Sequence, residues 1–338
     1  MVRGVHTLGV AVMGLVLATA ALAQGGAENP ACAPLASIAI PTADMPDAAA
    51  RARLAGCVSE DFYYADGGKP DYAQARLCAY VERDAGDEVM FGGSAVLMMI
   101  YANGDGVARN IGLAKKFACA VEGAPAELDG RLEHLDAMAS SSGKSERFDL
   151  CDDITSGYMM GFCASRGADA AKVDRDRRVT ALTAAWSAAD RAAFGKVRAA
   201  ADAYFDASVD GEVDMSGTAR GAMAVGAREA LEDGLVAALD AFEKGQLPQD
   251  GAAEFAAADK QLNTNYAAAM NYYKAQAAEG TGGSVNPQGI RDAERAWIRY
   301  RDAWVAFGAQ KYPAVAADAW RTYFTRERAQ ALKDLAGE

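Results

Sequence analysis

Four polar side chains beside an aromatic stripe are the residues whose types and spacing could form a site. Asp259 and Asn263 are one helical turn apart, and Arg295 and Asp302 are two turns apart in a later segment. Carboxylate, amide and guanidinium groups next to aromatic rings could bind a ligand or support acid–base chemistry. They could also form a hydrogen-bonded clamp that fixes how three helices dock, because a buried charge requires a partner. The pattern favours the clamp, with a site as the alternative.

Few other residues are suited to catalysis. If His6 leaves with a signal peptide, only His134 remains, so a catalytic triad would have to use it and a three-His zinc site cannot form. His134 lies in an apolar pattern typical of an amphipathic helix. A glycosidase needs two carboxylates, yet no pair stands out among the 46 acidic residues. We therefore predict that the protein is not an enzyme and holds no metal ion or cofactor.

Residues 1–23 have the layout of a cleaved signal peptide. They contain one positive charge, a short apolar stretch and an A-x-A site that ends at Ala23. The apolar stretch is too short to span a membrane. Gln24 follows the site where a lipidated protein would have Cys. We expect a periplasmic or secreted protein without a membrane anchor.

Composition points to a protein partner and an oxidising compartment. The six cysteines, an even number, allow up to three disulfides in a secreted chain. The net charge of −12 argues against nucleic acid or an anionic membrane as the partner. An acidic chain of this kind is better suited to a cationic protein.

The first half reads as a short leader followed by helical repeats. Residues 24–46 are rich in Ala, Pro and Gly, which predicts a loosely ordered leader that Cys32 could tie down. Within residues 47–140, a helix ending in tyrosine, a Gly-rich turn and a helix carrying cysteine occur twice, as is typical of helix–turn–helix solenoids. The second copy, from Tyr101 to Ala120, resembles a Sel1-type repeat. A polar break at 140–144 marks a boundary before the second half, residues 145–338.

The second half is a series of helices without a convincing strand, which predicts an all-α fold. Ser187 reads as a helix cap, and a long helix from Thr218 to Lys244 is expected to start at a Ser216 or Thr218 cap and to stop at Gly245. The clearest periodic signal is an apolar heptad, which predicts a buried helix face. Its members are Ile290, Ala293, Trp297, Tyr300, Trp304 and Phe307.

Two motifs in residues 254–308 resemble the signature helices of the LprI-type lysozyme inhibitors, a family also described as DUF1311. The family patterns are A-D-x-x-L-N-x-x-Y and R-A-W-x-x-Y-R-D-A, in that order. Residues 165–250 would then be inserted helices or a degenerate first copy of the same unit. The matching residues are Asp259, Leu262, Asn263 and Tyr266 in the first motif, and Arg295, Trp297, Tyr300, Arg301 and Asp302 in the second.

The resemblance implies a secreted helical module that binds a protein, with lysozyme or another muramidase as the expected partner. An inhibitor of this type would block the cleft of the enzyme. The alternative is a periplasmic scaffold in which the Sel1-like half binds a protein without inhibiting it. The expected partner-binding segment is the loop between the signature helices, formed by Gly282, Gly283, Ser284, Val285, Asn286 and Pro287.

The resemblance also bears on the disulfides. Members of the family often carry two further cysteines, at positions where this chain has Val305 and about Trp320. Since both are missing while Cys151 and Cys163 are present, the resemblance implies that Cys151 and Cys163 pair with each other. Cys151 would then lie in a loop before a helix that starts near Thr155. Cys57 and Cys78 are expected to join the two helices of the first repeat, and Cys32 and Cys119 remain by elimination only.

Overall fold

The structure is a computed structural model that describes residues 29–86, 91–141, 146–281 and 283–337, so the expected signal peptide lies outside it. Over these residues the chain forms two 3-10 helices and twelve α-helices and no strand, which confirms the all-α prediction. The elements of the first half are η1 (Pro34–Ser37), η2 (Thr42–Asp44), α1 (Ala48–Arg53), α2 (Ser59–Tyr64), α3 (Tyr72–Ala85), α4 (Gly93–Asn103), α5 (Ile111–Ala118) and α6 (Pro125–Ser140).

The two expected helix–turn–helix pairs are present as α2–α3 and α4–α5. Each second helix begins behind an amide or carboxylate cap: Asp71 accepts a hydrogen bond from the N–H of Gln74, and Asn110 from the N–H of Leu113. The first helix of each pair ends in a left-handed residue, Ala65 or Gly104. Two helical hairpins of similar layout therefore form this half, and their assignment to the Sel1 type stays a prediction.

The described part of the leader, residues 29–46, is held to the hairpins at several points and not at Cys32 alone. Lys116 donates hydrogen bonds to the carbonyl oxygens of Ala36 and Ile38. The hydroxyl of Tyr101 donates to the carboxylate of Asp44 at 2.9 Å. These contacts, together with η1 and η2, order a segment whose composition predicted a loose one.

Three disulfides are present, and all of their cysteines lie in the first half or the start of the second. The pairs Cys57–Cys78 and Cys151–Cys163 are those expected, and the third pair is Cys32–Cys119, which the sequence had left by elimination only. Cys151 lies in the loop before α7, and this helix starts at Gly157 behind a Ser156 cap, two residues later than expected. The disulfides agree with an oxidising environment for the folded chain.

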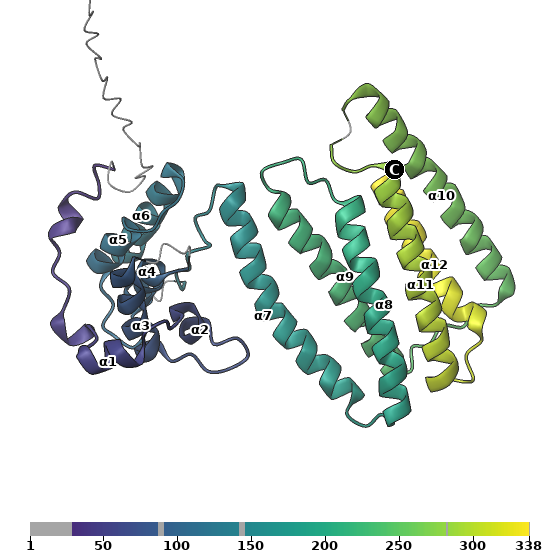
Figure 1. Cartoon of the computed structure of the whole chain (residues 1–338), viewed down its shortest axis with the longest axis horizontal. Helices are drawn as coiled ribbons and strands as arrows, with labels where there is room; N and C mark the ends of the chain where they lie inside the picture. The colour runs from purple at the N-terminus through teal and green to yellow at the C-terminus, as the bar shows by residue number, and fades with distance from the viewer. Residues whose placement is uncertain (1–28, 87–90, 142–145, 282, 338) are drawn as a thin grey trace, which may run out of the picture.

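Six long helices form the second half: α7 (Gly157–Thr183), α8 (Ala188–Glu212), α9 (Arg220–Glu243), α10 (Ala252–Glu279), α11 (Pro287–Lys311) and α12 (Ala317–Leu335). α7 packs along α9, α10 packs along α12, and the two middle helices, α8 and α11, pack on each other (Figure 1). α7 and α9 run parallel to each other and α8 runs antiparallel to both. α10, α11 and α12 repeat this arrangement, with α11 as the antiparallel helix (Figure 1). Two three-helix sets with the same internal arrangement are what a duplicated unit would give.

The apolar heptad forms the centre of the second half. All six of its members on α11 are buried, with Trp304 and Ile290 fully so. Trp304 stacks on Phe324 of α12 with ring centroids 5.1 Å apart, and it meets Phe194 of α8 edge to face. Aromatic packing of this density sets the positions of α8, α11 and α12 relative to one another.

The helix ends show both agreement and a difference. Ser187 caps α8 and accepts the N–H of Asp190, and α9 stops at Gly245 in a left-handed conformation, both as predicted. The predicted Ser216 or Thr218 cap of α9 is wrong, because the helix starts two residues after Thr218 behind Ala219 without a side-chain cap. The backbone of Thr218 instead packs against Gly157 of α7, where a side chain would collide with its carbonyl oxygen.

The buried apolar side chains fall into two clusters that meet along α7. Met159, near its start, belongs to the cluster of the first half, while Val179 and Leu182 pack against the cluster of the second half. Within the described part of the chain, no helix is long and apolar enough to cross a membrane.

Candidate functional site

The two sequence motifs meet in an open groove between α10 and α11, here called the motif groove. It has a volume of about 300 Å³. Four of its lining residues come from the first motif and three from the second. The lining residues are Asp259, Leu262, Asn263 and Tyr266 on α10, and Arg291, Glu294, Arg295, Trp297, Ile298 and Arg301 on α11.

The motif residues divide into a buried and an exposed set. Leu262, Trp297 and Tyr300 belong to the core of the second half, and Trp297 is only 2% exposed. Tyr300 contacts Tyr204 and Phe324 and does not line the groove. Packing alone therefore accounts for two of the three aromatic positions of the motifs, Trp297 and Tyr300, whereas Tyr266 lines the groove.

The exposed motif residues make no contact that holds helices together. Asn263 donates to the carboxylate of Asp259 at 3.1 Å, one turn back on the same helix. Arg295 pairs with Asp292 on its own helix, and both side chains are more than half exposed. Surface pairs of this kind contribute little to stability. Their polar groups therefore remain available to a partner at the groove.

Arg301 and Asp302, two neighbouring residues of the second motif, pair with each other. Their charged groups are 2.8 Å apart, and the guanidinium of Arg301 lies over the ring of Trp297 at 5.1 Å. Asp302 itself points to solvent and does not line the groove. Arg301 thus places its charged group both over Trp297 and in the lining of the groove.

The interhelical clamp that the sequence favoured exists, but other residues form it. Arg328 of α12 is 2% exposed, and it binds both carboxylate oxygens of Glu212 on α8 and one of Glu294 on α11. Buried Asn265 adds a second tie by donating to the carbonyl oxygen of Ala329 at 2.7 Å. The clamp therefore joins α8, α10, α11 and α12 without Asp259, Asn263, Arg295 or Asp302.

Burial and charge act in opposite directions on Glu294, which lines the motif groove. Removal of water raises the pKa of its carboxyl group above the usual value, and the neighbouring Arg328 partly offsets this rise. The ion pair with Arg328, at 2.9 Å, supplies the cation that a buried carboxylate requires. Glu294 is thus a structural acid at the base of the groove.

The expected partner-binding loop is tied to its neighbours over most of its length. Val285 is buried, and the side chain of Asn286 caps α11 by accepting the N–H groups of Gln288 and Gly289. The N–H of Ser284 donates to Asp214 in the loop before α9. Gly282 lies outside the described residues, whereas Pro287 starts α11. A partner could therefore reach the exposed residues Gly283, Ser284 and Asn286, but not the Val285 side chain.

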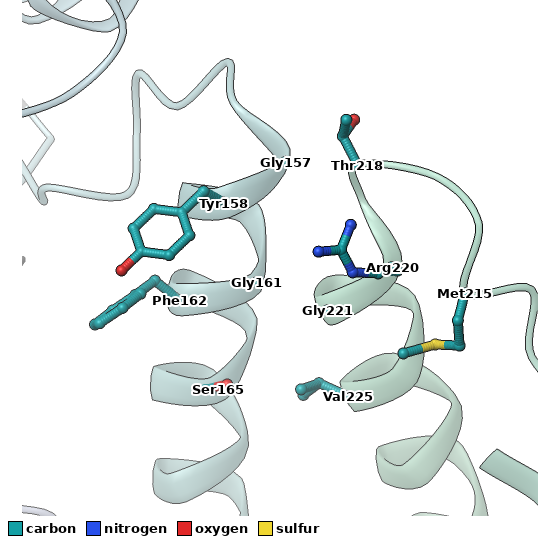
Figure 2. Close-up of a pocket in the computed structure, with 10 residues that line it drawn as sticks. All are labelled: Gly157, Tyr158, Gly161, Phe162, Ser165, Met215, Thr218, Arg220, Gly221 and Val225. Carbon is teal, nitrogen blue, oxygen red and sulfur yellow. The ribbon is translucent and has the colours of Figure 1, made fainter. Parts of the chain in front are cut away.

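A second groove, between the starts of α7 and α9, contains none of the predicted site residues. It has a volume of about 410 Å³ and is mainly apolar. Figure 2 shows Tyr158 and Phe162 projecting from the same side of α7, and Gly161 and Gly221 where the two helices come close. Tyr158 is 65% exposed. Four-residue spacing of glycines and aromatics in α7 was the available sequence signal.

The described residues contain no group of three or more His, Cys, Asp or Glu side chains placed to hold a metal ion. His134 is 3.0 Å from Asp153 and packs edge to face on Phe148. Both contacts position the end of α6 against the loop before α7. His134 therefore has structural neighbours in the loop before α7, far along the chain from the motif groove.

A comparison with protein families supports the motif-based resemblance for one part of the chain. The model of the family described as Lysozyme inhibitor LprI matches residues 244–332, which include α10, α11 and most of α12. Neither the curated proteins nor the solved structures give a match to this chain. The segment that forms the motif groove, residues 244–332, is thus similar to the LprI family of lysozyme inhibitors.

Proposed function

We propose that this protein binds a muramidase of the lysozyme type through the motif groove and slows its hydrolysis of cell walls. The observation that carries the proposal is the position of the exposed motif residues. Asp259, Asn263 and Arg295 line an open groove within the segment that matches the inhibitor family, and none of them is needed to join helices. Residues of mixed charge around an exposed apolar centre, Ile298, are typical of a protein-binding surface.

Charge supports an encounter with a cationic enzyme. The chain has a net charge of −12, but the matched segment 244–332 contains eleven basic and nine acidic residues. Long-range attraction therefore comes from the rest of the chain, whereas the motif groove itself presents Arg291, Arg295 and Arg301. Such arginines suit the carboxylates that a glycosidase cleft must contain.

The test uses the full-length mature chain and a lysozyme that digests a cell-wall suspension. Wild-type protein is expected to inhibit with one-to-one stoichiometry at physiological salt. Arg295→Ala removes a guanidinium from the groove, and Arg299→Ala removes one from the same helix outside it. We expect Arg295→Ala to weaken inhibition by about tenfold and Arg299→Ala to change it by less than about twofold. Equal effects of the two substitutions would show that the motif groove is not the site that binds lysozyme.

A protein-binding scaffold is the second candidate, and the two hairpins α2–α3 and α4–α5 favour it. It predicts that the chain captures a protein through residues 47–140 without slowing lysozyme. Wild-type protein that leaves cell-wall hydrolysis unchanged at a large molar excess would exclude the inhibitor and favour this role.

A further inference from the structure

A third groove lies between α9 and α12 and is here called the central groove. It has a volume of about 450 Å³, within the range of small-molecule and side-chain pockets. Small residues, Ala230 and Gly234 on α9 and Ala331 on α12, keep its walls apart. Its remaining lining includes the aromatic residues Tyr204, Phe205, Trp297, Tyr300 and Phe324.

Two carboxylates on α12, Glu327 and Asp334, line this groove without a cation. Among the described residues, no Lys, Arg or His side chain forms an ion pair with either of them, and Asp334 accepts only the amide of Gln330 at 2.7 Å. Arg328 also lines the groove, but its donors are directed to Glu212, Glu294 and the hydroxyl of Tyr204. The groove thus has an aromatic lining and two acidic side chains that no cation pairs with among the described residues.

Glu327 shows the effect of this missing cation. Although its side chain is reached by solvent, the surrounding protein displaces enough water to raise the pKa of its carboxyl group to about 7, while a hydrogen bond with Tyr323 acts in the opposite direction. A positive charge placed beside Glu327 would favour the ionised form. A cationic ligand should therefore bind in this groove more tightly than a neutral ligand of the same shape.

We propose that the central groove receives a lysine or arginine side chain of a cationic muramidase, an inference that rests on the proposed function. These side chains combine an apolar stem with a charged head, so the stem would pack on the aromatic lining while the head meets Glu327 and Asp334. The neighbouring helices add to the attraction, because residues 188–243 contain eleven acidic and five basic residues.

The two grooves then have separate roles in one interface. The motif groove presents three arginines and would repel a basic side chain, whereas the central groove would attract one. Trp297 lines both, so the two sites share one buried side chain. A partner with an acidic cleft and a basic rim would satisfy both grooves at once.

The experiment compares two double variants of the full-length chain that lose the same charge. Glu327→Gln with Asp334→Asn neutralises the central groove, and Glu133→Gln with Asp169→Asn neutralises two exposed acids far from it. Lysozyme affinity is measured at about 0.15 M salt, where distant charges are screened. Circular dichroism and melting temperature show whether each variant is folded.

We call the Glu327→Gln, Asp334→Asn variant the groove pair and the Glu133→Gln, Asp169→Asn variant the distant pair. We expect the groove pair to weaken lysozyme binding by about tenfold or more and the distant pair to change it by less than about twofold. Equal loss in both pairs would overturn the proposal, because it would show only a dependence on net charge. If wild-type protein inhibits and Arg295→Ala relieves inhibition while the groove pair has no effect, the central groove is excluded and the proposed function stands.

A small probe tests the cation site of the central groove independently of the proposed inhibition, even if lysozyme is not a partner. Blocked arginine, N-acetyl-arginine methylamide, and its uncharged citrulline analogue are titrated into labelled wild-type protein. We expect the backbone amide resonances of Gly234 and Ala331 to shift with the arginine probe alone, and not in the groove pair. Shifts with both probes, or with neither, would overturn a cation site in the central groove.

Discussion

Arg328 and Glu294 form an ion pair of 2.9 Å, and each of them lines a different groove. Arg328 faces the central groove and Glu294 the motif groove. Because Arg328 also binds Glu212, a movement of α12 would alter α8 and α11 together. The pair therefore joins the two proposed contact sites through one buried charge.

Trp297 and its neighbour Ile298 should separate stability from binding. Trp297→Ala removes a side chain that is 2% exposed and is expected to lower the free energy of unfolding by about 3–5 kcal/mol. Ile298 is 39% exposed, so Ile298→Ala should cost less than about 1 kcal/mol and weaken lysozyme binding. Urea denaturation and inhibition assays measure both. Intact stability in Trp297→Ala would show that the heptad is an interface and not a core.

Arg328→Met leaves two carboxylates without their cation and should lower the free energy of unfolding by about 3–5 kcal/mol near neutral pH. The loss should shrink as pH falls, because Glu294, whose pKa burial already raises, can then take up a proton. Arg328→Lys keeps the charge but not the geometry that reaches both acids, so it should restore only part of the stability. A loss that is the same at all pH values would contradict the role of Glu294.

Glu327 should make stability fall as pH rises toward neutrality. Its folded pKa of about 7 lies above the ordinary value of 4.5, so the folded chain keeps a proton that the unfolded chain has released. The stability linked to this proton is complete below about pH 4.5 and is lost as pH rises through about 7. Glu327→Gln should flatten this part of the profile, while Glu133→Gln should not. The free energy of unfolding, measured by chemical denaturation between these pH values, tests this expectation.

Salt should act on the rate of association more than on the rate of dissociation. The long-range charge resides outside residues 244–332, so added salt screens the approach while the groove contacts remain. Stopped-flow or surface-based kinetics across a range of ionic strength would measure both rates. If dissociation carries most of the salt effect, the bound interface itself would have to be mainly ionic.

The sequence predicted the parts of the second half that depend on local pattern. The apolar heptad placed Trp297, Tyr300 and Trp304 in the core, and the Ser187 cap followed from side-chain chemistry alone. Arg328 was missed, because its partners Glu212 and Glu294 come from helices whose packing no local pattern specifies. The α9 start was misplaced because backbone contact with Gly157, and not a cap, determines where that helix begins.

Three of the four polar residues that the sequence singled out line the motif groove, whereas Asp302 does not. Asp259, Asn263 and Arg295 do come together with Trp297, yet they line an open groove where the sequence favoured a buried clamp. Whether a polar residue faces solvent or a neighbouring helix depends on the rotation of α10 and α11 about their axes. That rotation is fixed by contacts such as Asn265 with Ala329, which lie far apart in the chain.

Every disulfide in the described chain closes before residue 164, so the protein has one half whose fold responds to redox conditions and one half that does not. A thiol reductant would cut the covalent ties of the hairpins and of the loop before α7, while α8–α12 would keep the same bonds as before. Amide exchange should then accelerate in residues 29–163 and stay slow around Trp304. The segment similar to lysozyme inhibitors would therefore survive in a reducing cell interior, and only its hairpin partner would require an oxidising one.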